Sequence, residues 1–126
     1  MLVLDSGGVS RLARRRPDAA ALIAAFKAEG LWPPVVPSVV LAESITGRQR
    51  NDANINRFLK TCDIVEDLPQ HLARRAGALR TLARQGSAVD AIVVAIAEPG
   101  RAVLTSDPKD LTSLAGYTNG VQIFRA

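Results

Sequence analysis

Residues 1–8 of the chain are MLVLDSGG, in which four apolar residues lead directly into a carboxylate and two glycines. A short, continuous apolar run is typical of a strand that is buried on both faces of a parallel sheet. The sequence therefore predicts a strand over residues 1–4 that presents Asp5 at its carboxyl end. Ligands of open α/β sheets bind outside the carboxyl ends of the strands, so Asp5 is a candidate functional residue.

Short apolar runs and helical patterns alternate along the rest of the chain. We expect further strands within 33–37, 62–67, 102–105 and 121–124, and helices within 6–16, 17–30, 38–47, 52–61, 69–85, 88–98 and 106–116. This alternation predicts an α/β fold with a short, mainly parallel central sheet flanked by helices. No linker divides the chain, so we expect one domain over residues 1–126.

The composition limits the kinds of site that the chain can build. Aromatic residues make up only 4% of the 126 residues, which disfavours the stacking of bases on exposed rings. Cys62 and His71 are the only residues of their types, which makes a disulfide, a zinc site or a Ser-His-Asp triad improbable. The net charge of +4 fits RNA, DNA or an acidic protein, although a mildly basic chain needs no such partner. Neither a membrane-spanning run nor a signal peptide is evident, so we expect a cytoplasmic protein with no membrane partner.

Four acidic residues are expected near the same edge of the sheet. Asp5 and Asp107 follow strands, whereas Glu43 and Asp90 lie near the starts of helices, which face that edge. Two carboxylates about 4 Å apart repel by roughly 4 kcal/mol at an effective dielectric constant near 20. Such a cluster is stabilised by protonation or by a divalent cation, and Mg²⁺ or Mn²⁺ suits a site made of carboxylates.

Each of these acids also has a structural interpretation. Asp5 and Asp107 are good N-caps, and Asp90 in the first turn of a helix complements the helix dipole. Glu43 is compatible with a solvated helix position. Because a capping residue can also bind a metal ion, the two interpretations are not exclusive.

Four segments resemble the signature segments of the PIN domain: MLVLDSGGVSRL, VVPSVVLAES, SAVDAIVVAIAE and AVLTSDPKDLTSLA. The compact form is most similar to the VapC-type toxins of type II toxin–antitoxin pairs. The resemblance implies a three-layer PIN-like fold and a Mg²⁺- or Mn²⁺-dependent endoribonuclease that hydrolyses RNA phosphodiesters. It also implies a homodimer whose cleft is blocked by a cognate antitoxin protein.

The same resemblance implies roles for particular residues. The four catalytic acids are Asp5, Glu43, Asp90 and Asp107, and the resemblance makes Asp5, Asp90 and Asp107 the metal ligands. Ser6, Thr105 and Asp110 are expected to support the site.

Arginines are the main candidates for contacts with RNA or a partner protein. Arg11, Arg14 and Arg15 follow the first acid closely, although a solvated helix face explains them equally well. Arg74, Arg75, Arg80 and Arg84 are expected to form the solvent face of the helix within 69–85.

Two other functions fit the sequence less well. A non-catalytic PIN-like module that binds RNA or protein would not need all four acids. A phosphatase with Asp5 as nucleophile would carry a second acid at position 7, where the chain has Gly7.

Overall fold

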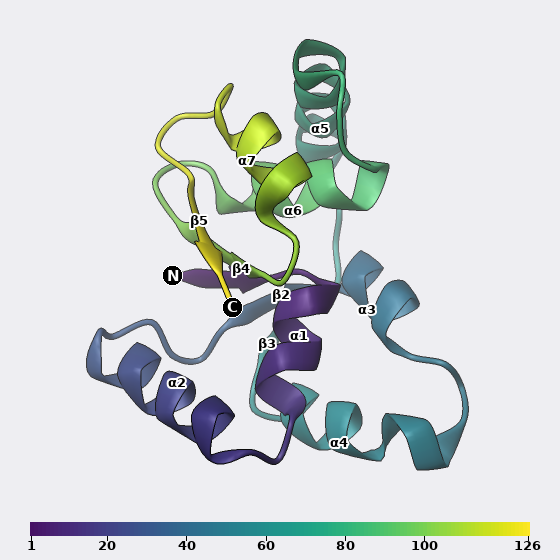
Figure 1. The fold of residues 1–126 in the computed structure, drawn as a ribbon. Helices are drawn as coiled ribbons and strands as arrows, with labels where there is room; N and C mark the ends of the chain where they lie inside the picture. The colour runs from purple at the N-terminus through teal and green to yellow at the C-terminus, as the bar shows by residue number, and fades with distance from the viewer.

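The computed structural model describes all residues 1–126, which form an α/β fold around a five-stranded sheet. The strands are all parallel and lie in the order β3-β2-β1-β4-β5 (Figure 1). Their bounds are β1 (Leu2–Leu4), β2 (Val35–Pro37), β3 (Asp63–Val65), β4 (Ala102–Thr105) and β5 (Gln122–Arg125). The predicted fold class, with its short parallel sheet, is confirmed.

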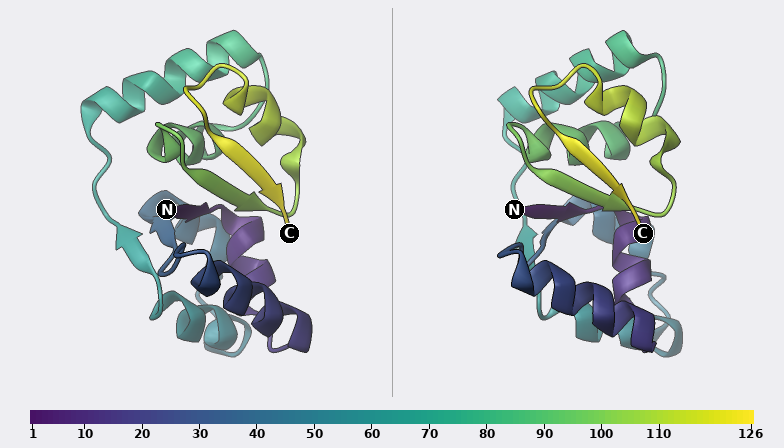
Figure 2. Two further views of the ribbon diagram at one scale, coloured as in Figure 1. Left: turned by 90° about the vertical axis from the view of Figure 1, so that its left-hand side faces the viewer. Right: turned by 60° about the vertical axis from the view of Figure 1, so that its left-hand side comes forward.

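Seven helices flank this sheet and complete three layers. They are α1 (Ser6–Ala13), α2 (Pro17–Ala28), α3 (Ser38–Ser44), α4 (Gln49–Leu59), α5 (Gln70–Ala83), α6 (Ala88–Ala97) and α7 (Pro108–Ala115). The views in Figure 2 show α5, α6 and α7 on one side of the sheet and α1, α2 and α4 on the other. Helix α1 packs against α2, α3 and α4, and α6 packs against α5, α7, β1 and β4. None of the helices combines the length and the apolar character needed to cross a membrane.

The core is aliphatic and is centred on β1 and α6. All three residues of β1 are fully buried, as the apolar run predicts for a central strand. Helix α6 buries six of its ten residues, since apolar side chains surround almost its whole circumference. Burial of one such aliphatic side chain stabilises the fold by about 1.5–3 kcal/mol.

Several helix boundaries differ from the predicted ranges by up to three residues; α3, for example, ends at Ser44 rather than at Gly47. Helix α1 ends at Ala13 rather than near Arg16, because Arg14 adopts an extended backbone conformation. Helix α4 begins at Gln49, three residues before the predicted start at Asp52. The buried Asp52 carboxylate accepts hydrogen bonds from the backbone N–H groups of Thr46 and Gly47, which also lower its pKa.

One ion pair links α5 to the end of α6. Arg75 of α5 donates from Nε and Nη2 to the two carboxylate oxygens of Glu98, at 2.8 and 3.0 Å. The backbone N–H of Asn119 donates to the same carboxylate at 3.0 Å. These bonds join α5 and the end of α6 to the loop that leads into β5.

Candidate active site

The candidate active site lies where the order of the strands reverses. Strands β2 and β3 lie on one side of β1, and the later strands β4 and β5 lie on the other side. The reversal therefore falls between β1 and β4, whose residues Leu2–Leu4 pair with Ala102–Leu104. This is the position at which open α/β sheets bind their ligands. Asp5 follows β1, and Thr105 is the last residue of β4.

The Asp5 carboxylate is held by both of its oxygens. Oδ1 accepts a hydrogen bond from the backbone N–H of Gly8 at 2.7 Å, so Asp5 is the N-cap of α1. Oδ2 accepts a bond from the Thr105 hydroxyl at 2.5 Å. That hydroxyl in turn accepts a bond from the backbone N–H of Asp107 at 3.1 Å. The capping interpretation of Asp5 is thus confirmed, and Thr105 connects Asp5 to the start of α7.

The environment of Asp5 raises the pKa of its carboxyl group. Only 9% of the residue is exposed. Desolvation raises the pKa of Asp5 most, the charge of Asp90 raises it further, and the hydrogen bonds from Thr105 and Gly8 oppose the rise only in part. Asp90 is therefore close enough to repel Asp5 electrostatically. A cation between the two groups would remove this repulsion.

Asp90 is fixed at the start of α6 by a capping box. Its backbone N–H donates to Ser87 Oγ at 3.0 Å, and its Oδ2 accepts from the backbone N–H of Ser87 at 3.0 Å. The Asp90 side chain is half-buried, and Oδ1 makes no hydrogen bond to another residue. The carboxylate is thus held in place by one oxygen and retains the other for a ligand.

Asp107 and Glu43 are less constrained than Asp5 and Asp90. Asp107 is exposed and occupies the N-cap position of α7, but its side chain caps nothing, so the capping interpretation is wrong for this residue. Glu43 is exposed in the last turn of α3 and its side chain makes no hydrogen bond. No three Asp, Glu, His or Cys side chains lie close enough together to hold a metal ion. The structure therefore joins Asp5 and Thr105 by a hydrogen bond, places Asp90 near enough for its charge to raise the pKa of Asp5, and leaves Glu43 and Asp107 exposed.

Two glycines allow α1 to lie directly against the end of β4, and their role was not predicted from the sequence. A Cβ atom on Gly8 would lie 2.4 Å from the backbone oxygen of Leu104, and one on Gly7 would lie 2.9 Å from the backbone nitrogen of Ser106. Only glycine permits so close an approach. The signal was present in the sequence as a pair of glycines immediately after a strand-end acid.

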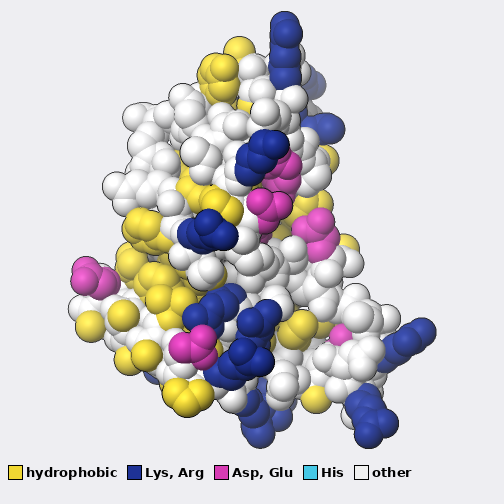
Figure 3. All heavy atoms as spheres, in the orientation of Figure 1, with side chains coloured by type: hydrophobic (Ala, Val, Ile, Leu, Met, Phe, Trp, Pro, Cys, Tyr) yellow, Lys and Arg dark blue, Asp and Glu magenta, His cyan; other side chains and the backbone are white.

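The remaining predicted residues lie on or next to α1 and α7. Ser6 and Asp110 are half-buried, in the first turns of α1 and α7. Arg11 Nη2 forms an ion pair with Asp18 at 3.0 Å, whereas Arg14 and Arg15 are exposed and make no ion pair. Figure 3 shows acidic side chains grouped in the middle of one face, with basic side chains above and below them. This distribution of charge would suit a cation at the centre and a polyanion across the face.

The fold is shared with solved structures of low sequence identity. The chain is similar to one from a toxin–antitoxin complex of Klebsiella pneumoniae, with a TM-score of 0.70, 23% identity and 100% of both chains covered. It is also similar to a chain of FitAcB from Neisseria gonorrhoeae, with a TM-score of 0.66 and 16% identity over 99% of this chain and 97% of the other. PAE2754 from Pyrobaculum aerophilum has a TM-score of 0.59 and 16% identity, over 97% of this chain and 89% of the other. No family model and no curated protein sequence matches the chain.

Proposed function

We propose that the chain is a metal-dependent endoribonuclease and the toxin of a type II toxin–antitoxin pair. The observation that carries this proposal is the pairing of a buried, hydrogen-bonded Asp5 with the charge of Asp90 at the strand-order reversal. The toxin role is supported by the similarity to a chain of a toxin–antitoxin complex. The positive net charge of the chain supports a polyanionic substrate.

The donor atoms of the site suit a hard divalent cation. Asp5 and Asp90 would hold Mg²⁺ or Mn²⁺ through carboxylate oxygens, which are the ligands that these ions prefer, and the exposed, unbonded Asp107 would have to turn toward the ion to become a third ligand. The repulsion between Asp5 and Asp90 is the feature that a bound cation would relieve. When bound, the cation would activate a water molecule and stabilise the charge that develops on the phosphodiester.

The chain's own residues would position these groups. Thr105 and the Gly8 N–H hold Asp5 in one orientation, and Ser87 does the same for Asp90. Such fixed ligands need no rearrangement during the reaction, which is the main advantage of a preorganised site. Glu43 is exposed and its side chain makes no hydrogen bond, so it would be free to reach the substrate or its attacking water.

A second candidate is a non-catalytic PIN-like module that binds RNA or protein. It is favoured by one observation, namely that no three acidic side chains lie within reach of a common metal ion. Such a module would bind RNA without cutting it, and its affinity would not depend on Asp5.

The deciding experiment is cleavage of a mixture of tRNA and rRNA by the purified chain with Mg²⁺, Mn²⁺ or EDTA. Asp5→Asn and Asp90→Asn should abolish cleavage and preserve the helical circular dichroism spectrum. Asp63→Asn is the matched control, since Asp63 is exposed at the opposite, amino-terminal end of β3. Cleavage at the wild-type rate by Asp5→Asn would show that the assignment is wrong. No cleavage by the wild type, together with no heat of metal binding, would favour the non-catalytic module.

The proposal includes two protein partners, a cognate antitoxin and a second copy of the chain. Helix α2 offers a surface for one of them, because five of its six alanines are exposed and it packs chiefly against α1. Light scattering measures the oligomeric state directly: a homodimer has twice the 13.4 kDa mass of one chain. A single-chain mass at high concentration would contradict the dimer.

A further inference from the structure

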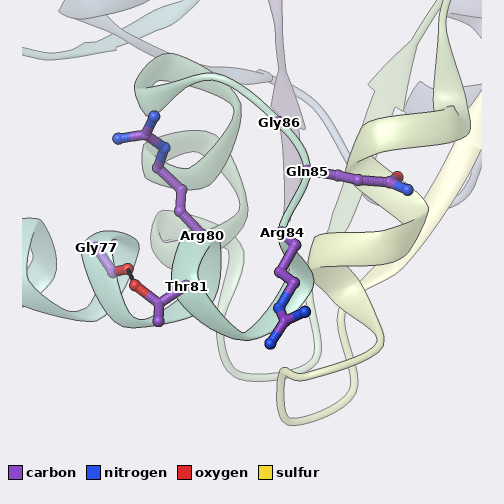
Figure 4. A pocket seen from close by; sticks show the side chains of 6 residues that line it. All are labelled: Gly77, Arg80, Thr81, Arg84, Gln85 and Gly86. Atoms are coloured by element: carbon purple, nitrogen blue, oxygen red, sulfur yellow. Dashed lines mark hydrogen bonds between the residues drawn. The ribbon is translucent and has the colours of Figure 1, made fainter.

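A hollow lies at the turn between α5 and α6, outside the residues that the sequence pointed to. Its volume is about 470 Å³. No hydrophobic side chain lines it, and its lining residues are Gly77, Arg80, Thr81, Arg84, Gln85 and Gly86 (Figure 4). Both of its charged residues are arginines, so its charge is uniformly positive.

Arg80 and Arg84 carry no compensating partner within the chain. Both are exposed, and neither guanidinium forms an ion pair or a hydrogen bond. Arg75, on the same helix, is by contrast paired with Glu98. A bound anion would supply the counter-charge that the chain itself does not provide.

The hollow adjoins the candidate active site. Gly86 directly precedes Ser87, which caps Asp90 at the start of α6, and a Cβ atom on Gly86 would lie 3.6 Å from the Cβ of Asp90. Gln85 accepts a hydrogen bond from Ser113 of α7 at 2.8 Å. Helix α7 follows Asp107 directly. An extended ligand at the acidic centre could therefore continue into the hollow.

The directions of the two arginines indicate an extended ligand. Arg84 ends α5 in a left-handed conformation, with φ of 53°, and the chain turns sharply there. Figure 4 shows the Arg80 and Arg84 side chains pointing away from each other. A single phosphate would not engage both guanidinium groups, whereas two phosphates of one strand would.

We propose that Arg80 and Arg84 bind two backbone phosphates of an RNA strand that extends from the active site over the α5–α6 turn. This proposal rests on the proposed function. Guanidinium groups bind phosphate oxygens in a bidentate geometry. The absence of apolar lining disfavours a protein segment, whose interface would need a hydrophobic centre. The absence of aromatic rings disfavours base stacking, so the strand would be held by its backbone.

The test measures binding of a labelled, unstructured 16-nucleotide RNA in EDTA, where cleavage is prevented, at salt concentrations from 50 to 250 mM. Each phosphate contact contributes about 0.7 to the slope of log affinity against log salt for a single strand. Arg80→Gln with Arg84→Gln should therefore reduce the slope by about 1.4 and the affinity about 25-fold near 0.1 M salt. The control is Arg50→Gln with Arg57→Gln, which removes the same charge from α4, at the opposite end of the molecule from α5 (Figure 1).

The outcomes separate this proposal from the proposed function. Equal losses in the two double variants would overturn it, because general electrostatics would then explain the binding. Competition by polyglutamate as strong as that by unlabelled RNA would also overturn it, in favour of an acidic protein. In cleavage assays the Arg80 and Arg84 variant should raise KM and leave kcat unchanged. If the wild type cleaves RNA and the Arg80 and Arg84 variant binds RNA as tightly as the wild type, the proposed phosphate contacts are wrong and the proposed function stands. If the wild type neither cleaves nor binds RNA, both the phosphate contacts and the proposed function are wrong.

Discussion

Replacing Gly8 by alanine tests whether the contact between α1 and β4 builds the site. The new Cβ would lie 2.4 Å from the backbone oxygen of Leu104, whereas such contacts essentially never fall below 3.0 Å. Strand β4 cannot yield easily, because it pairs with β1 on one side and β5 on the other. The start of α1 must therefore move by about 0.6 Å, and it carries the N–H group that holds Asp5.

The expected cost follows from overpacking of a fixed contact. Inserting a methyl group into a well-packed site destabilises a protein by about 1–3 kcal/mol. The unfolding entropy is about 2.1 cal/mol/K per residue, so this cost lowers the Tm of a 126-residue chain by about 4–11 °C. The displaced Asp5 should also reduce RNA cleavage, by up to about 100-fold for a displacement approaching 1 Å.

Gly77→Ala is the matched control, and its effect has the opposite sign. Gly77 lies inside α5, and nothing lies within 4 Å of a Cβ placed there. Alanine stabilises a helix interior over glycine by about 0.5–1 kcal/mol, so Tm should rise by about 2–4 °C. Differential scanning calorimetry measures both variants. A Gly8→Ala protein that melts at or above the wild-type Tm would refute the argument that α1 is in tight contact with β4.

Four further predictions concern the titratable groups. Because burial raises the pKa of Asp5, the ionised carboxylate destabilises the fold at pH values above that pKa. The neutral side chain of Asp5→Asn should therefore raise Tm near pH 7. The gain in Tm should vanish near pH 3, where the wild-type Asp5 is protonated and is also neutral. Because Arg75 lowers the pKa of Glu98, the pair stabilises the fold above the ordinary value of 4.5; the Tm deficit of Arg75→Gln should shrink as the pH falls below about 4. Desolvation raises the pKa of the Cys62 thiol to about 11, so a disulfide reagent near pH 8 should modify it about 100-fold more slowly in the folded chain than in urea. Asp107→Ala removes no hydrogen bond from an exposed side chain, so it should change the free energy of unfolding by less than about 0.5 kcal/mol in a urea titration while it abolishes cleavage.

The position of Asp5 could be predicted because its determinants are local. Four apolar residues before it require a buried central strand, and the polar and glycine residues after it permit a helix start. The capping box of Ser87 and Asp90 is equally local, since the two residues are three positions apart. The folded structure keeps these local conformations because its tertiary contacts favour the same conformations.

The other features depend on contacts between distant parts of the chain. The Thr105–Asp5 hydrogen bond joins residues 100 positions apart and requires β4 to lie beside β1. Arg80 and Arg84 were expected only as a solvated helix face, because the hollow beside them exists only once Arg84 turns the chain. Of the two interpretations of Asp107, the cap is the one that the Asp-Pro sequence at a helix start suggests, and the folded backbone does not form it.

The four predicted acids thus divide into two pairs that differ in how firmly hydrogen bonds hold their side chains. Asp5 and Asp90 are held by backbone groups of their own helices, so their positions are set when the chain folds. Asp107 and Glu43 are exposed and unbonded, so their carboxylates are free to turn toward a cation or a substrate. A site in which all four were fixed close together would oppose folding, since each added carboxylate repels the others by several kcal/mol. Under the proposed function, holding two acids firmly and leaving two free would limit this repulsion in the metal-free chain and would let the second pair complete the site around a bound cation.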